Sequence, residues 1–333
     1  MRPALLPPNV IHHFYAGGSR IAALRGLQLD DDHMPEEWLG AAASTFGDPS
    51  RGPSRLADGT LVRDAIAADP NAYLGERHVD RFGADPALLV KLLDAGQRLP
   101  VHFHPGRAFA RDALGSPWGK TEAWIIVEAE PGAAVGLGFA EDTELATVRE
   151  WMRTQDSRAM LAALRELPVQ PGDAILVPAG TPHAIGEGIL LVELQEPTDL
   201  SVLLEWNGFE LSEDDGHLNL GWDRALAALD LTAWDDERLA SVRPDGAALL
   251  PPAADPYFRA DRLTNGARLE PGFAILVALE GAGTVATQAG GEQPVRRGDA
   301  VLIPYAAGEG ELTGDVTAIR CRPPHPAAPE GRW

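Results

Sequence analysis

The stretch PGDAILVPAGTPHAIG (residues 171–186) returns 126 residues later as RGDAVLIPYAAGEGEL (297–312). Both copies contain Gly-Asp-Ala, three branched aliphatic residues and a proline. A Gly-Asp pair is typical of a tight turn, and an aliphatic run that ends in proline is typical of a short buried strand. One such segment is common, but two copies in the same order indicate an internal repeat. The sequence therefore predicts two related β-structures in one chain.

Short apolar runs, separated by glycine and proline, surround each copy of the repeat and predict further strands. The upstream segment WIIVEAEPGAAV (124–135) has a looser echo in AILVALEGAGTV (274–285). Short strands that wind into a closed barrel leave no free sheet edge. We therefore expect an all-β fold of two jelly-roll barrels. In the first half, the strands are expected at 88–94, 99–104, 123–129, 173–178 and 188–194.

Two stretches have apolar residues near helical spacing, namely 141–167 and, more weakly, 222–242. We expect them to be helical insertions in an otherwise β-rich chain. The first domain is then predicted at 1–212, with its helical insertion at about 141–167. The second domain is predicted at 213–333, where a helical connector precedes the second barrel.

Three histidines and one glutamate lie next to these predicted strands. His102 and His104 alternate along one strand, so both side chains project from the same face. Glu122 opens the next strand, and His183 follows the turn of the first repeat. Each residue alone has commoner structural roles, but three imidazoles and a carboxylate together suit Zn²⁺, with iron, manganese or nickel also possible. We expect one metal ion per chain.

The second copy of the repeat lacks these ligands. Glu309 stands where His183 would be, Gly272 falls where Glu122 would be, and the histidine pair has no counterpart. We therefore expect the second barrel to bind no metal and to have a structural packing role.

The composition restricts the classes of partner. The chain has 333 residues and a net charge of −21, which argues against nucleic-acid or anionic-membrane binding. A single cysteine, Cys321, fits a reducing compartment because no intrachain disulfide can form. Neither a signal-peptide pattern nor an apolar run of about 18 residues is found. A cytoplasmic location is expected, while the oligomeric state stays open.

Only two of the 28 basic residues are lysines, Lys91 and Lys120, and both lie near the histidine pair. An ammonium can lose its proton when buried, whereas a guanidinium cannot. The two lysines are therefore candidates for chemistry that arginine cannot perform, although chance retention explains either one alone.

Together these segments match the two-part cupin signature and resemble the class I mannose-6-phosphate isomerases of the short bacterial form. A weaker likeness extends to FYAGG (14–18), EEW (36–38) and the ligand-free second barrel, so nearly the whole chain is covered. The closer likeness is in PALLVKLLDAGQRLPVHFHP (86–105), GKTEAWIIV (119–127) and PGDAILVPAGTPHAIGEGILLVELQEPTD (171–199).

The resemblance implies a double cupin that interconverts mannose 6-phosphate and fructose 6-phosphate by moving a proton between C1 and C2 through an enediol(ate). The family holds zinc with a glutamine, two histidines and a glutamate. The histidines and the glutamate correspond to His104, His183 and Glu122, and the glutamine position is His102. Imidazole is the better zinc ligand, so this departure is expected to preserve or strengthen metal binding.

The resemblance also implies roles for both lysines. Lys120 matches a lysine implicated in proton transfer, which makes it the predicted catalytic residue, unless it only orients substrate oxygens or pairs with a carboxylate. In the first case, zinc would act as a Lewis acid beside the sugar O1 and O2. Lys91 matches a substrate-phosphate lysine, unless it lies inside the barrel against an acid such as Glu193. If Lys120 is not the base, Glu196 or Asp199 is next. The predicted substrate-binding residues are Lys91, Arg107, Glu193 and Glu196.

Two departures from the family concern the phosphate. Leu203 stands where the family has a catalytic arginine, and Pro100 where it has a phosphate-binding serine. Losing a guanidinium and a hydroxyl removes much of the recognition of a dianion. Arg107 and Arg111, just beyond the ligand strand, are possible substitutes, or they are solvated surface residues.

Three functions remain in competition. The first is a zinc-dependent mannose-6-phosphate isomerase, and the second an isomerase of another or unphosphorylated sugar. The third is a catalytically silent sugar-binding cupin. A cupin dioxygenase with iron is a further possibility, against which the fused ligand-free barrel and the GKTE motif (119–122) argue. Each of the first three implies a small sugar or sugar phosphate as partner.

Overall fold

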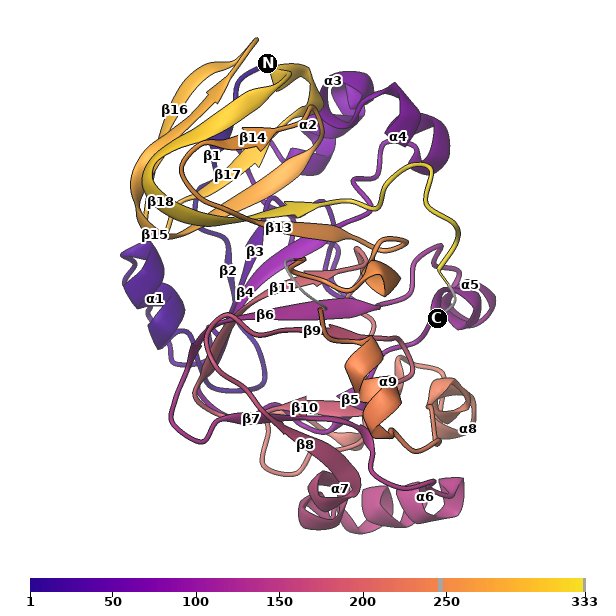
Figure 1. Cartoon of the computed structure of the whole chain (residues 1–333). Helices are drawn as coiled ribbons and strands as arrows, with labels where there is room; N and C mark the ends of the chain where they lie inside the picture. The colour runs from indigo at the N-terminus through magenta and orange to yellow at the C-terminus, as the bar shows by residue number, and fades with distance from the viewer. Residues whose placement is uncertain (245–247, 332–333) are drawn as a thin grey trace.

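The computed structural model describes residues 1–244 and 248–331. Within these ranges the strands form three antiparallel sheets, and helices lie around them (Figure 1). The prediction of an all-β fold with helical insertions is confirmed. In Figure 1 the sheet of the second repeat lies at the top, a six-stranded sheet in the middle and a five-stranded sheet below.

The six- and five-stranded sheets form the first barrel and share an apolar core. Val135 and Ile185 from one sheet pack in the same cluster as Ile126 and Leu191 from the other. The six-stranded sheet has the order β2 (Val10–Ile11), β3 (Glu36–Leu39), β4 (Leu89–Ala95), β11 (Ile189–Gln195), β6 (Glu122–Ala129), β9 (Ala174–Val177). The five-stranded sheet has the order β12 (Val202–Leu203), β5 (His102–Phe103), β10 (His183–Ile185), β7 (Ala134–Phe139), β8 (Leu164–Pro168).

The second repeat forms a seven-stranded sheet with its own apolar cluster. Its first strand comes from the start of the chain, so residues assigned by sequence to the first domain complete the second sheet. The boundary near residue 212 remains a prediction. The order is β1 (Ala4–Leu5), β17 (Ala300–Ile303), β15 (Ala274–Thr287), β18 (Gly310–Arg322), β13 (Arg259–Leu263), with β14 (Ala267–Leu269) on β18 and β16 (Gly291–Arg296) on β15.

The helices are short and lie outside the sheets, and α6 and α7 form the lower end of the molecule in Figure 1. They are α1 (Ser19–Arg25), α2 (Val62–Ala68), α3 (Pro70–Leu74), α4 (Glu76–Phe82), α5 (Arg107–Leu114), α6 (Leu145–Thr154), α7 (Ser157–Ala163), α8 (Trp222–Ala225) and α9 (Asp236–Ser241). Single 3-10 turns lie at η1 (Glu213–His217), η2 (Leu226–Ala228), η3 (Pro252–Ala254) and η4 (Tyr305–Ala307). None of the helices in the described ranges has the length and apolar character that crossing a membrane requires.

The secondary structure departs from expectation in three places. The strand expected at 99–104 is only β5, because Leu99 and Pro100 form no strand pairing. The helical stretch expected at 141–167 ends before Leu164. Leu164 and Leu167 belong instead to β8, which pairs with β7 and buries both leucines. The stretch 222–242 is broken into α8, η2 and α9.

The strand register corrects one correspondence between the two repeats. Glu122 pairs with Val177 at the end of β9, and the equivalent position of β17, Ile303, pairs with Ala274. The counterpart of Glu122 is therefore Ala274 and not Gly272. The correspondence expected from the sequence was wrong by two positions, because segments 124–135 and 274–285 match only in their aliphatic pattern.

Candidate active site

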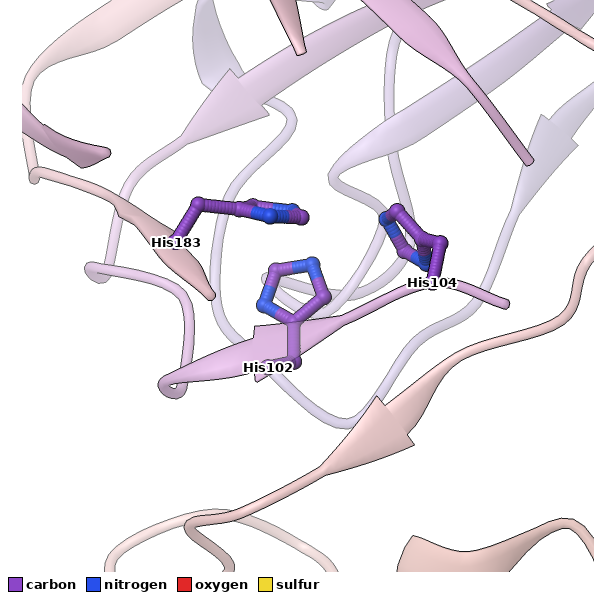
Figure 2. Close-up of side chains that lie close together, drawn as sticks. All are labelled: His102, His104 and His183. Atoms are coloured by element: carbon purple, nitrogen blue, oxygen red, sulfur yellow. The ribbon is translucent and has the colours of Figure 1, made fainter. Parts of the chain in front are cut away.

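Three buried histidines meet between the two sheets of the first barrel. His102 and His183 lie directly opposite each other on the adjacent strands β5 and β10, and His104 follows two residues after His102. Figure 2 shows the three imidazoles turned toward one another. Their ring centroids are 4.1 Å (His102–His183), 4.9 Å (His104–His183) and 5.0 Å (His102–His104) apart.

Each imidazole has its tautomer fixed by a backbone carbonyl. Because a carbonyl oxygen can only accept, Nδ1 of each ring is the protonated nitrogen and Nε2 carries the lone pair. Burial lowers the pKa of His104 and His183 to about 3 and that of His102 well below its ordinary value, so all three rings are neutral. The acceptors of His102, His104 and His183 are the carbonyls of Pro100 (2.8 Å), Leu200 (2.9 Å) and Thr181 (2.8 Å).

Glu122 faces this triad from the opposite sheet, at the start of β6. Its Oε2 lies 3.1 Å from His104 Nε2, and its Oε1 lies 3.5 Å from His183 Nε2. Lys120 Nζ is 2.6 Å from Glu122 Oε2 and 2.9 Å from His104 Nε2. Burial opposes ionisation of Glu122, but the Lys120 charge beside it holds its pKa well below the usual range.

These side chains fit a transition metal. One ligand nitrogen from each histidine lies within 4.8 Å of the others, and Nε2 of His183 is buried without a hydrogen-bond partner among the described residues. Neutral imidazoles with free Nε2 lone pairs are what Zn²⁺ and related ions require. A second group, Asp31, Asp32 and His33, is largely exposed and consists of residues that already pair with each other.

A cavity of about 340 Å³ opens beside the triad. Its size falls in the range of small-molecule sites. Its lining residues include His102, Lys120, Glu122, Lys91 and Glu193. The structure thus brings together most of the residues that the sequence singled out.

Lys91 is held by two carboxylates. Its Nζ is 3.1 Å from a carboxylate oxygen of Glu36 and 3.3 Å from one of Glu193. Of the two surroundings considered for Lys91 from the sequence, the structure therefore shows the acidic partner inside the barrel. The two acids behave differently: burial and the nearby Glu122 raise the pKa of Glu193 to about 7, whereas His13 and Lys91 overcome burial and lower that of Glu36. Tyr15 donates a further hydrogen bond to Glu36 (2.9 Å).

Arg107 and Glu196, two of the predicted substrate-binding residues, lie outside the lining of this cavity. They form an ion pair with each other, and the guanidinium of Arg107 stacks 4.7 Å from the ring centroid of Tyr257. Neither of them is among the described residues that line the cavity. The substrate-binding role predicted for this pair gains no support from the arrangement and stays a prediction. Arg111 is exposed on α5 and does not line the described cavity either.

The two departures from the family do face the cavity. Leu203 and Pro100 both line it, and Leu203 lies directly opposite His102 in the ladder between β12 and β5. Arg51, in the loop before α2, is the only arginine among the described lining residues. Arg51 was not predicted to line the site, because nothing in the sequence distinguishes it from other loop arginines. It also gave no role to Tyr15 and Glu36, although FYAGG and EEW carried the signal.

The fold and the site together define a double-barrel cupin protein with a buried histidine metal centre in one barrel. No family model matches the chain. Individual relatives do: it is 30% identical to mannose-6-phosphate isomerase ManA of Bacillus subtilis over 254 residues, 74% of this chain and 76% of that protein. A mannose-6-phosphate isomerase of Streptococcus mutans is 26% identical over 96% of this chain and 98% of its own length.

Solved structures agree on the fold. The mannose 6-phosphate isomerase of Bacillus subtilis superposes with a TM-score of 0.76 at 20% identity, covering 97% of this chain and 100% of that chain. A variant of phosphomannose isomerase from Salmonella typhimurium gives a TM-score of 0.74 at 16% identity, covering 97% of this chain and 100% of that one. The chain belongs to the mannose-6-phosphate isomerase family, a family of sugar isomerases.

Proposed function

We propose that the chain is a cytoplasmic, zinc-dependent aldose–ketose isomerase that interconverts mannose 6-phosphate and fructose 6-phosphate, with one metal ion held by His102, His104, Glu122 and His183. The observation that carries this proposal is the set of three converging neutral imidazoles, each with an unprotonated Nε2, beside a cavity of small-molecule size that His102 lines. Membership of the family supports the reaction type.

A bound Zn²⁺ would supply Lewis acidity toward the sugar oxygens. The residues of the chain perform the proton transfer. Lys120 lines the cavity beside the ligand carboxylate, and we assign it the removal of the proton from C2 of the aldose and its return to C1 of the enediol(ate). We assign to Lys91, which lines the cavity between Glu36 and Glu193, hydrogen-bond donation to substrate oxygens.

A second candidate is the isomerisation of an unphosphorylated sugar, which the charge of the cavity favours. Six carboxylates line it, whereas Lys91 and Lys120 are already paired with acids. Arg51 is the remaining cationic side chain among the described lining residues, apart from histidines. A dianion in such a cavity has few donors to replace its hydration. The lining acids are Glu36, Glu122, Glu193, Asp199, Asp214 and Asp215.

One assay separates the candidates. The zinc-loaded protein is incubated with hexoses and with hexose 6-phosphates, and product is followed for each. Turnover of mannose 6-phosphate above that of mannose supports the first candidate, and the reverse order supports the second. If the metal-loaded protein isomerises no sugar of either kind, isomerase function is wrong and the silent sugar-binding cupin takes its place.

A further inference from the structure

A second cavity, of about 390 Å³, lies between the helical pair α3–α4, the second sheet and the segment that follows β18. In Figure 1 this yellow segment leaves β18 and passes alongside α4 on its way to the C-terminus. Gly75 closes one wall, because a Cβ there would lie 2.7 Å from the ring of Tyr305. No described residue lines both this cavity and the sugar cavity.

Two arginines on the wall of this cavity lie in an unfavourable position relative to each other. Arg259 on β13 is directly opposite Arg322 on β18 in the antiparallel ladder. Like charges directly opposite on neighbouring strands destabilise a sheet. The next pair on the same face of this ladder, Asp261 and Arg320, has opposite charges and so follows the ordinary pattern. The arginine pair is therefore an exception within a ladder that otherwise matches its charges.

The nearby acids do not neutralise the pair. Asp261 is shared, at 2.9 Å from Arg320 and 2.8 Å from Arg322. Glu270 is 3.7 Å from Arg322 and largely exposed, so solvent screens it. Within the described residues Arg259 forms no ion pair, and its Nε donates to the carbonyl of Pro323 (3.0 Å).

Two further features indicate unused binding capacity. Nε of Arg322 is buried and has no hydrogen-bond partner among the described residues. Burial and the neighbouring Arg322 lower the pKa of Arg259 to about 10. A buried donor without a partner costs free energy, and so does a partly buried guanidinium beside another. An anion between the two side chains would offset the repulsion between the two guanidinium charges.

We propose that this cavity is a binding site for a small phosphorylated anion, held by Arg259 and Arg322. A phosphate group accepts several charge-assisted hydrogen bonds at once, and guanidinium groups, which these two residues carry on facing strands, are suited to donate them. A cavity of about 390 Å³ has room for a small metabolite attached to that phosphate. Because the site lies against the sheet of the second repeat, which lacks the metal ligands, it gives that repeat a role beyond packing.

The test is a titration of the full-length protein with inorganic phosphate, followed by calorimetry and by the thermal unfolding midpoint at constant ionic strength. Wild type is expected to bind phosphate and to unfold at a higher temperature with it. Arg259→Gln and Arg322→Gln are each expected to weaken binding by roughly tenfold or more, the loss of a charge-assisted hydrogen bond. The control Arg262→Gln changes an exposed arginine on the same strand and should bind like wild type.

Several results would overturn the proposal. One is the absence of phosphate binding by the wild type, and another is unchanged affinity in Arg259→Gln, which would show that phosphate binds away from this cavity. Acetate at the same ionic strength should bind far more weakly, and equal binding would exclude a phosphate-specific site. If Arg259→Gln does not fold, Arg259→Lys keeps the charge, removes the fork and should still weaken phosphate binding.

Discussion

The two repeats form the same turn and strand, but the side chains next to that strand form a polar site in the first repeat and an apolar core in the second. In each, a glycine with positive φ (Gly172, +97°; Gly298, +90°) precedes an aspartate whose carboxylate accepts from a backbone N–H three residues earlier, at 3.0 Å for Asp173 and 2.9 Å for Asp299. Four buried aliphatic residues follow in both β9 and β17. The shared sequence pattern therefore has a shared structural cause.

The difference lies in a few positions around those strands. Glu122 in the first barrel corresponds to Ala274 in the second, which is buried in an apolar cluster with Leu276 and Leu312. Glu309, at the position of His183, is exposed. The second barrel is filled by its own side chains, whereas the first keeps a polar cavity. Turn and aliphatic residues therefore determine the barrel, and a handful of substitutions determine whether it has a metal site.

The metal site offers the largest test of this comparison. His183→Ala removes a ligand from the first barrel, and we expect the bound metal and the isomerase activity to be lost. Glu309→Ala changes the matching position of the second barrel and should leave both unchanged. Elemental analysis of the purified proteins after supplementation with zinc measures the effect, with about one metal ion per chain expected for wild type and for Glu309→Ala. Two ions per chain in wild type, or a full complement in His183→Ala, would contradict the assignment.

Lys120 comes next in expected effect. Arginine at this position keeps the positive charge beside Glu122 but cannot give up its proton, so Lys120→Arg should lower kcat by roughly 10²–10⁴-fold while the metal content stays the same. Steady-state kinetics and elemental analysis on one preparation separate the two effects. Near-normal turnover would assign the base elsewhere. Asp199 would then be the first choice because it lines the cavity, whereas Glu196 is paired with Arg107.

Leu203 tests the phosphate specificity of the first barrel. Because Leu203 lines the cavity opposite His102, Leu203→Arg adds a guanidinium at the position where the sequence resemblance implies a family arginine. We expect kcat/KM for mannose 6-phosphate to rise by roughly tenfold, the contribution of one charge-assisted hydrogen bond. Mannose, which has no phosphate, is the matched control substrate and should gain nothing. Wild-type turnover of mannose 6-phosphate at about 10 s⁻¹ or more would show that another cation already serves, and Arg51 is then the residue to change.

The sequence predicted the parts of the molecule that depend on local patterns. The repeat, the strands expected at 88–94, 123–129, 173–178 and 188–194, and the convergence of His102, His104 and His183 all follow from turn residues and alternation along a strand. The spacing of Leu164 and Leu167 fits a helix as well as a strand, and only pairing with β7 decides between them. The local sequence pattern alone therefore does not distinguish helix from strand at these two leucines.

Contacts between segments that are distant in the sequence could not be predicted. Arg107 was expected near the substrate because it follows the ligand strand, but helix α5 takes it to Glu196 and Tyr257. Arg51 enters the cavity from a loop about 50 residues before the first ligand. Which arginine reaches a cavity depends on loop paths, and these are determined by tertiary packing and not by sequence spacing.

The smallest expected effect concerns the two equivalent glycines, and it tests whether the repeats share only a turn or also its surroundings. Both have positive φ, so alanine at either position is strained by about 1–2 kcal/mol. A Cβ on Gly172 would meet only Arg262 Nη2 at 3.6 Å, whereas one on Gly298 would lie 2.0 Å from the carbonyl oxygen of Leu24 in α1. Gly172→Ala should therefore lower the free energy of unfolding by the strain alone. Gly298→Ala should cost about 1–3 kcal/mol more, because α1 has to move away from the second sheet. Chemical denaturation of both variants measures the difference, and equal losses would mean that α1 adjusts at no cost.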